Sequence, residues 1–275
     1  MATNRLDLTL LDSRLKTSCI GKSKELNELW DSIDSTNKRA IELARAGTPA
    51  GVIVIARQQT AGRGRLGRTW ESPANAGLYV SFLLRPACSR EDIPLYTLAL
   101  GVAAAQAILI CTGVQVGLKW VNDLVVEGKK LGGILAEMVS MVDNNPPALV
   151  LGIGINVDFT AIPLPTELEG HIEWLTRLVT KPIDTNQLIA ELALQLEEHS
   201  NLIESGRKEA VLNSWRRHSA TLGKQVRVLS ANGNKEGTAI DINEDGALIV
   251  QTTGGERLTL HAGEITIRNL DGTYS

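Results

Sequence analysis

The protein has 275 residues, 43% of them hydrophobic, and its 28 Lys and Arg against 31 Asp and Glu give a formal net charge of −3. That length suits about two domains, and the slightly acidic balance excludes a protein that coats nucleic acid non-specifically. The sequence contains no secretory signal and no cysteine pattern typical of disulfides, which predicts a cytoplasmic protein. It also has no apolar run of roughly 20 residues, so we expect no membrane contact.

The first half of the chain predicts alternating helices and strands. Polar residues at 34–36 precede a run with apolar residues at helical spacing, which indicates a capped helix. Residues 51–56 and 77–84 have the length and composition of strands, and the long loop between them has no apolar periodicity. Residues 94–111 are rich in Leu and Ala and predict a buried helix that ends at Gly113.

The middle of the chain predicts a β-hairpin followed by a further strand. Two short strands flank residues 119–124, a tight turn occupies Glu127 and Gly128, and residues 130–139 form the return arm. Residues 148–157 have the apolar composition of another strand.

The last part of the chain predicts two helices and then a separate β-structure. Helical spacing places the helices near residues 186–204 and 208–217. Short alternating runs follow, separated by Asn-Gly, Asp-Gly and Gly-Gly turns, which predicts a small all-β domain. We therefore expect one domain over residues 1–219, with an extension of unknown role at 1–25, and a second domain over residues 220–275.

The most unusual segment is the loop from Gly62 to Arg68, which reads GRGRLGR. Glycines free the backbone and arginines supply planar, permanently charged donors. This combination suits a phosphate or a carboxylate, and the loop can close over its ligand. The segment is not a P-loop, because GxxxxGK[ST] is absent, and it does not open a helix as a dinucleotide-binding motif would. The alternative interpretation is a solvated basic loop.

Two further groups follow in the hairpin. The segment KWVNDL brings Asn122 and Asp123 between two strands, where both residue types are rare, so it is either a turn or a site. Lys130 follows the turn and precedes two glycines that would let a ligand approach. The alternative for Lys130 is an ordinary surface lysine.

Other polar residues have both a structural and a functional interpretation. Ser35 and Thr36 stand where a helix cap is expected. Asn156 ends an apolar strand, where ligands of a sheet bind and where turns also form. The four histidines lack metal-ligand spacing and no serine lies in a GxSxG motif, so zinc and nucleophilic-triad chemistry are not indicated.

Taken together, these motifs resemble the biotin–protein ligases. The matching segments, in order, are DSIDSTN at 31–37, QTAGRGRLGRTW at 59–70, KWVNDL at 119–124 with KKLGGILAE after it, and GIGIN at 152–156. The resemblance covers the chain from about Leu26 onward, and GRGRxGR followed by KWxNDL is a highly specific pair. Val121 replaces the proline usual in the family, and Leu66 replaces an arginine found in many members. The turn is therefore expected to be less rigid and the loop less cationic.

The resemblance implies an α+β fold, in which a mixed sheet flanked by helices is similar to the catalytic domain of class II aminoacyl-tRNA synthetases. A C-terminal SH3-like β-barrel would follow. It also implies a ligase that activates biotin with ATP to biotinyl-5′-AMP and transfers biotin to a lysine, forming an amide. The implied cofactor is Mg²⁺ with ATP, and the implied partner is the biotin carboxyl carrier domain of acetyl-CoA carboxylase.

Roles for individual residues also come with the resemblance. Biotin would be bound by Ser35, Thr36, Asn37, Gln59, Arg63, Gly64, Arg65 and Lys130. The nucleotide would be bound by Arg68, Trp70, Asn122 and Asn156. The catalytic groups would be Lys130, Arg63, Arg65 and Asp123, with Asp123 near the incoming lysine or the metal.

Three rival functions fit the motifs less well. A lipoate ligase or octanoyltransferase shares the implied fold, but neither GRGRxGR nor KWxNDL is expected in one. Biotin-dependent repression needs a helix-turn-helix domain, and only some 30 residues precede the first motif, so we expect no specific DNA binding. A pure biotin-binding module has no need of an arginine-rich anion loop. Whether an edge strand pairs two copies into a homodimer is left open.

Overall fold

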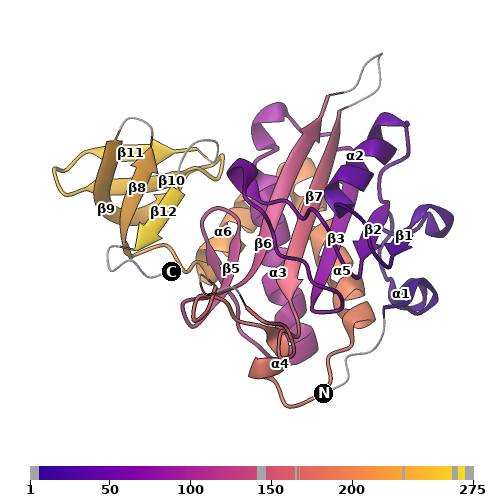
Figure 1. Ribbon diagram of the computed structural model, residues 1–275. Coiled ribbons are helices and arrows are strands. Elements are labelled where there is room, and N and C mark those ends of the chain that lie inside the picture. The colour runs from indigo at the N-terminus through magenta and orange to yellow at the C-terminus, as the bar shows by residue number, and fades with distance from the viewer. Residues whose placement is uncertain are drawn as a thin grey trace.

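The computed structural model describes residues 6–140, 147–164, 166, 168–230, 233–261 and 266–269. Within these residues a mixed sheet flanked by helices is followed by a separate antiparallel sheet (Figure 1). This arrangement confirms the α+β fold expected from the sequence.

The large sheet carries most of the core. Its strands are β1 (Glu28–Trp30), β2 (Ile53–Ala56), β3 (Gly77–Leu84), β4 (Gly117–Lys119), β5 (Asp123–Val126), β6 (Lys129–Val139) and β7 (Ala148–Asn156). They lie in the order β1-β2-β3-β7-β6-β5-β4. Only the β1–β2 pair is parallel among these described strands. β3 and β7 are buried along their whole length, because helices cover both faces of the sheet.

The predicted hairpin is present between β5 and β6. Its turn places Glu127 at φ 48° and Gly128 at φ 79°, the two left-handed positions of a type I′ turn. The pairing shifts register between Leu124 and Val125. Such a bulge changes the direction in which neighbouring side chains point, and here it lies beside Asp123.

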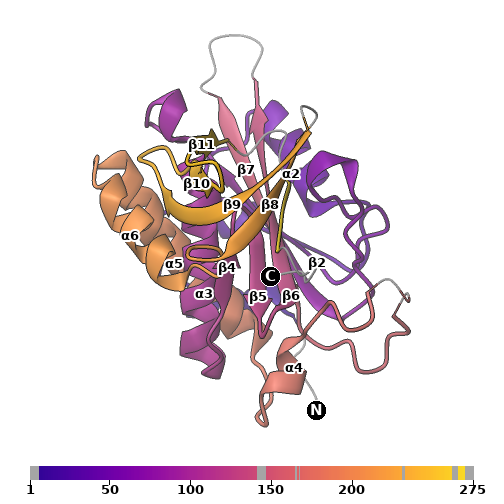
Figure 2. The same cartoon turned by 90° about the vertical axis from the view of Figure 1, so that its left-hand side faces the viewer.

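Helices cover the two faces of the large sheet. They are α1 (Leu8–Arg14), α2 (Thr36–Arg45), α3 (Leu95–Thr112), α4 (Leu175–Leu178), α5 (Thr185–Glu204) and α6 (Lys208–His218). Figure 2 shows α2 on one side of the sheet and α3, α5 and α6 on the other. In the described chain, α3 alone is long and apolar enough to cross a membrane, but 67% of it is buried. It packs between the sheet and two other helices, as the core helix of a globular domain does.

The N-terminal segment before β1 packs against α5, a contact that the sequence did not predict. Arg14 forms an ion pair with Asp184 at 2.6 Å, at the start of α5. The buried carboxylate of Glu197 accepts hydrogen bonds from the backbone N–H groups of residues 18–20. These contacts hold the segment before β1 against the helical layer.

The C-terminal sheet begins after the predicted boundary near Ala220. Its strands are β8 (Gln225–Ser230), β9 (Gly233–Ile242), β10 (Leu248–Thr252), β11 (Arg257–Leu260) and β12 (Thr266–Asn269), in the order β11-β10-β9-β8-β12. It contacts the large sheet through Trp120, whose indole N–H donates to the Gly246 carbonyl at 3.0 Å. Arg216 on α6 also forms an ion pair with Asp241 at 2.7 Å.

Candidate active site

The first turn of α2 presents polar side chains toward the large sheet. Ser35 is the N-cap residue, and its hydroxyl accepts from the Lys38 N–H at 3.4 Å. Thr36 and Asn37 follow in the helix and are both buried. The capping role expected for Ser35 is therefore present, and it leaves the next two side chains facing the sheet rather than solvent.

Gln59, in the loop after β2, is hydrogen-bonded to this turn. Its Oε1 accepts from the backbone N–H of Thr36 at 2.9 Å and lies 3.1 Å from the Thr36 hydroxyl. Its Nε2 donates to the Ser72 hydroxyl at 2.8 Å. Helix and loop thus hold one another through a neutral set of hydroxyl and amide groups.

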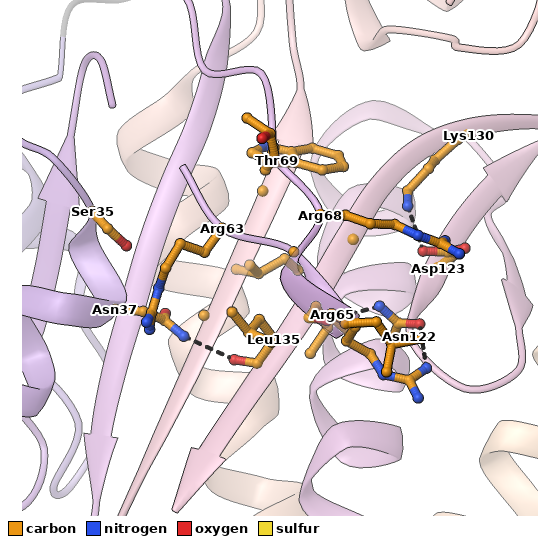
Figure 3. A pocket seen from close by; sticks show the side chains of 18 of the residues that line it. Ser35, Asn37, Arg63, Arg65, Arg68, Thr69, Asn122, Asp123, Lys130 and Leu135 are labelled. Carbon is orange, nitrogen blue, oxygen red and sulfur yellow. Dashed lines mark hydrogen bonds and ion pairs between the residues drawn. The ribbon is translucent and has the colours of Figure 1, made fainter. Parts of the chain in front are cut away.

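Asn37 connects the turn to β6. Its Nδ2 donates to the Leu135 carbonyl at 3.1 Å (Figure 3). It also donates to Glu137 Oε2 at 2.8 Å. The same Glu137 carboxylate forms an ion pair with Arg63. A single acidic side chain therefore ties the start of α2 to the glycine- and arginine-rich loop.

The loop from Gly62 to Arg68 folds back on itself. Gly64 N–H donates to the Arg68 carbonyl at 2.7 Å, and Trp70 N–H donates to the Gly62 carbonyl at 3.0 Å. A short 3-10 turn covers Arg65–Gly67. A Cβ at Gly62 would lie 2.3 Å from the Trp70 carbonyl, so this first glycine is needed for the close approach.

Arg65 points from this loop to the KWVNDL turn. Its Nη1 donates to Asn122 Oδ1 at 3.1 Å (Figure 3). Burial lowers the pKa of Arg65, the Asp123 carboxylate opposes that effect, and a guanidinium keeps its charge in either case. Asn122 is fixed in turn, because its Nδ2 donates to the Ile134 carbonyl at 2.9 Å.

Lys130 and Asp123 lie across the hairpin from one another. The ammonium is 2.6 Å from Asp123 Oδ1 and 5.3 Å from the centre of the Trp70 ring. The lysine is therefore not an ordinary surface lysine: its side chain is 22% exposed and it faces an aromatic ring and a carboxylate.

Two glycines of β7 let side chains lie flat on the sheet. A Cβ at Gly152 would lie 1.8 Å from Asn37 Oδ1, and a Cβ at Gly154 would lie 2.3 Å from Trp70 Nε1. The Trp70 N–H is buried and has no hydrogen-bond partner among the described residues. The glycines of GIGIN are thus needed because the side chains of Asn37 and Trp70 occupy the space that a Cβ would take.

Most of these groups line one pocket. Its lining is Ser35, Thr36, Asn37, Gln59, Arg63, Gly64, Arg65, Leu66, Arg68, Thr69, Trp70, Lys119, Trp120, Asn122, Asp123, Lys130, Gly133, Ile134, Leu135, Gly152, Ile153 and Gly154. Every site residue expected from the sequence is included except Asn156. That residue is buried, and its Nδ2 donates to the Lys130 carbonyl at 3.3 Å and the Glu173 carbonyl at 3.0 Å. A nucleotide contact by Asn156 stays a prediction.

The sequence interpretation gave no role to several residues that shape the pocket. Glu137 ends the KKLGGILAE match, and Lys119 begins KWVNDL, but neither was assigned a function. Ser81 lies in the middle of an apolar strand and carries no motif. In the sequence, the alternating glycines of GIGIN are the one indication that other side chains approach β7 closely.

The residues present suit a metal that arrives with a nucleotide. In the described parts of the chain, no group of three or more His, Cys, Asp and Glu side chains could hold a metal ion. Asp123 is the carboxylate that lines the pocket. Mg²⁺ is commonly bound by one or two carboxylates together with substrate phosphates, so this single carboxylate fits Mg²⁺ carried by ATP.

Comparison with known families gives two matches along the chain. Residues 29–156 match the biotin/lipoate A/B protein ligase family, and residues 221–268 match the biotin protein ligase C-terminal domain. The bifunctional ligase/repressor BirA of Bacillus spizizenii is 34% identical over 82% of this chain and 69% of its own length. The biotin–[acetyl-CoA-carboxylase] ligase of Mycobacterium tuberculosis is 31% identical over 95% of this chain and 97% of its own length.

Solved structures agree with these matches. The biotin protein ligase of Aquifex aeolicus, in complex with biotin and ATP, superposes with a TM-score of 0.77. It is 28% identical to this chain, and the match covers 88% of this chain and 99% of the other.

Proposed function

This chain belongs to the biotin protein ligase family, and on that basis we propose that it activates biotin with ATP and transfers it to a lysine of a carrier protein. In the first step a biotin carboxylate oxygen attacks the α-phosphate of ATP, giving biotinyl-5′-AMP and pyrophosphate. In the second step the lysine amine attacks the biotin carbonyl, an amide forms and AMP leaves. The observation that carries this proposal is one pocket that holds a neutral hydrogen-bonding set and a cationic set.

The neutral set suits the ureido ring of biotin. Ser35, Thr36 and Gln59 offer hydroxyl and amide groups at one place in the pocket. A buried urea needs both donors and acceptors, and each unmatched group would cost about 1–3 kcal/mol. The dithiolane ring of lipoate would leave these protein groups without partners, so this set favours biotin.

The cationic set suits the reacting carboxylate and phosphates. Arg63, Arg65 and Lys130 line the same pocket. We assign Lys130 to the oxygens on which negative charge develops during adenylation, because its ammonium is held in place by Asp123 before the reaction. Arg63 and Arg65 would bind the biotin carboxylate and the α-phosphate, and Trp70 and Asn122 would contact the nucleotide.

Mg²⁺ would enter with ATP, and Asp123 would be the residue nearest to it. The ion would neutralise charge on the phosphates. Asp123 also orients Lys130, so this carboxylate links the metal side of the pocket to the lysine that faces the substrate.

We propose that the carrier is the biotin carboxyl carrier domain of an acetyl-CoA carboxylase. The Mycobacterium tuberculosis relative is named as a ligase for that enzyme. A cytoplasmic location is consistent with three free cysteines, which stay reduced in that compartment. A homodimer also stays a prediction. β6 extends beyond its pairing with β5, and the edge after Ile134, up to Val139, is where a second copy would pair.

A transfer assay tests the proposal. The purified chain is incubated with biotin, ATP and Mg²⁺ and an unmodified carrier domain, and mass spectrometry then measures the carrier. We expect one biotin on one lysine, and pyrophosphate release that depends on biotin. The same assay with lipoic acid or octanoate and a lipoyl domain is the comparison. Modification of the lipoyl domain without modification of the biotin carrier would contradict the proposal.

A further inference from the structure

Ser81 lies beneath the pocket, in β3, and joins two of the predicted biotin-binding side chains. Its side chain is fully buried, with 0% of its surface exposed. Its Oγ is 2.6 Å from Asn37 Oδ1 and 2.8 Å from Thr36 Oγ1. This position lets Ser81 control where the hydrogens of its neighbours point.

The orientation of the Asn37 amide is fixed on the side away from Ser81. Its two neighbours there, the Leu135 carbonyl at 3.1 Å and Glu137 Oε2 at 2.8 Å, can only accept hydrogen bonds. The NH₂ group must face them, as Figure 3 shows for Leu135. The amide oxygen of Asn37 therefore faces Ser81.

Ser81 has one hydroxyl hydrogen, and its direction follows from Asn37. Two oxygens 2.6 Å apart need a hydrogen between them, and the amide oxygen of Asn37 cannot supply it. Ser81 thus donates to Asn37. Toward Thr36 it presents a lone pair, so across that 2.8 Å contact Ser81 is the acceptor.

The Thr36 hydroxyl is then directed into the protein. Its hydrogen has two acceptors, Ser81 Oγ at 2.8 Å and Gln59 Oε1 at 3.1 Å. Gln59 is itself fixed as an acceptor here, because its Oε1 also receives the Thr36 backbone N–H at 2.9 Å. With either acceptor, Thr36 turns only a lone pair toward the pocket, and a ligand atom bound there has to be a donor.

We propose that Ser81 is a positioning residue that keeps Thr36 an acceptor and so makes the site select a ring N–H over a ring oxygen. The inference rests on the proposed function, in which the ligand is biotin with its two ureido N–H groups. A cyclic carbamate analogue, with oxygen in place of one ring N–H, keeps the shape of biotin. One of its two isomers would place two acceptors face to face at Thr36, which costs binding free energy.

Calorimetry without ATP tests this selection. The dissociation constants of biotin and of both carbamate isomers are measured for the wild type, Ser81→Ala and Ser214→Ala. Ser214 is a matched control, because it is buried on α6 and its hydroxyl has no hydrogen-bond partner among the described residues. In Ser81→Ala the hydrogen of Thr36 loses its nearer acceptor. Only the longer 3.1 Å contact to Gln59 Oε1, an oxygen that it shares with the Thr36 backbone N–H, still holds it inward, so the hydroxyl turns toward the pocket more often. We expect biotin to bind about fivefold to tenfold more weakly and the preference over one isomer to fall by a similar factor.

The kinetic parameters separate positioning from a structural role. With saturating biotin, kcat for pyrophosphate release and KM for ATP should stay within about twofold in Ser81→Ala, because the cationic set is untouched. Ser214→Ala should match the wild type in every measurement. Equal weakening of biotin and both isomers, with an unchanged preference, would mean that Ser81 only packs the strand and would overturn the proposal.

A second variant keeps the test decisive if Ser81→Ala does not fold. Thr36→Val removes the hydroxyl and keeps the shape, so it should abolish the preference between biotin and the disfavoured isomer. A preserved preference in Thr36→Val would also overturn the proposal. Failure of the proposed function has a different signature, because the wild type itself would then not bind biotin.

Discussion

The ammonium of Lys130 lies 2.6 Å from a carboxylate oxygen of Asp123 in a pocket that also holds three arginines. The two residues come from neighbouring strands of a hairpin, and the bulge between Leu124 and Val125 lies next to Asp123. A lysine held in this way is oriented before any substrate arrives. The contribution to adenylation that we propose for it would therefore need little reorganisation when negative charge develops.

Replacing this lysine should affect the chemical step more than binding. We expect Lys130→Ala to lower kcat for biotin-dependent pyrophosphate release by roughly 10²–10³ and to change the biotin KM less. Lys129→Ala is the control, since Lys129 is adjacent on the hairpin but lies 3.9 Å from Glu173 and outside the pocket lining. An unchanged kcat with a raised KM would show that Lys130 merely binds substrate.

The close contact between Gly152 and Asn37 gives a second prediction. A methyl group at Gly152 would lie 1.8 Å from Asn37 Oδ1, so Asn37 must move and lose its contacts with Ser81 and Glu137. Gly152→Ala should raise the biotin KM at least about tenfold, and overpacking should lower the free energy of unfolding by about 1–3 kcal/mol. Steady-state kinetics and urea unfolding measure both effects.

Gly101→Ala is the matched control for that substitution. Gly101 lies within α3, and the nearest atom to its added Cβ is 3.5 Å away. Alanine should be tolerated there, and the higher helix propensity of Ala should stabilise the protein by up to about 1 kcal/mol. If both variants keep a normal biotin KM, Asn37 does not hold the biotin site in place.

The sequence predicted most of the strands and helices because their apolar patterns are local. β3 was expected at residues 77–84 and lies at Gly77–Leu84, and α3 ends at Gly113 as expected. The short β1 and α1 were not predicted. β1 has three residues, and α1 has a single fully buried side chain, Leu11, so neither carries a periodic signal.

The candidate site was predicted only where residues form motifs. Thr36 and Lys130 belong to segments whose order and spacing resemble a family, and they do line the pocket. Ser81 and Glu137 act through contacts between segments far apart in the chain, which no local pattern encodes. Asn156 is a different case, because this motif residue lies outside the pocket lining and donates to the backbone carbonyls of Lys130 and Glu173.

His199 predicts a pH dependence of stability away from the site. Burial first, and the nearby charge of His218 second, lower the pKa of His199 from 6.5 to about 4. Between these values the unfolded chain binds a proton that the folded protein does not, so the free energy of unfolding falls as pH falls from 6.5 toward 4. The loss should reach about 3 kcal/mol near pH 4. Urea unfolding at several pH values measures it.

Two variants isolate the contribution of this histidine. His199→Gln should flatten the decline in stability below pH 6.5, since no group at that position then titrates. His171→Gln, at an exposed histidine, should leave the decline as it is in the wild type. Identical pH profiles for the wild type and His199→Gln would contradict the prediction.

The last prediction concerns Arg65 and the retention of the adenylate. Biotinyl-5′-AMP is a reactive anhydride, so the site should hold it until the carrier lysine arrives. Arg65 connects the Gly62–Arg68 loop to the KWVNDL turn through its 3.1 Å hydrogen bond to Asn122. Without that side chain, Arg63 and its ion pair with Glu137 still hold the first part of the loop, but the loop is no longer held to Asn122 by this bond.

Arg65→Gly should therefore still form the adenylate, because Lys130 and the ATP-bound metal remain, but should release it early. We expect pyrophosphate release that exceeds carrier biotinylation, and biotin on lysines of unrelated proteins added to the assay. Arg65→Lys keeps the charge but not the planar guanidinium, so its excess of pyrophosphate release over carrier biotinylation should lie between those of Arg65→Gly and the wild type. Arg257→Ala, at an exposed arginine of β11, should behave as the wild type. If Arg65→Gly instead loses adenylation while its remaining product stays bound, Arg65 acts in the first chemical step, because an arginine needed only for retention would leave that step intact.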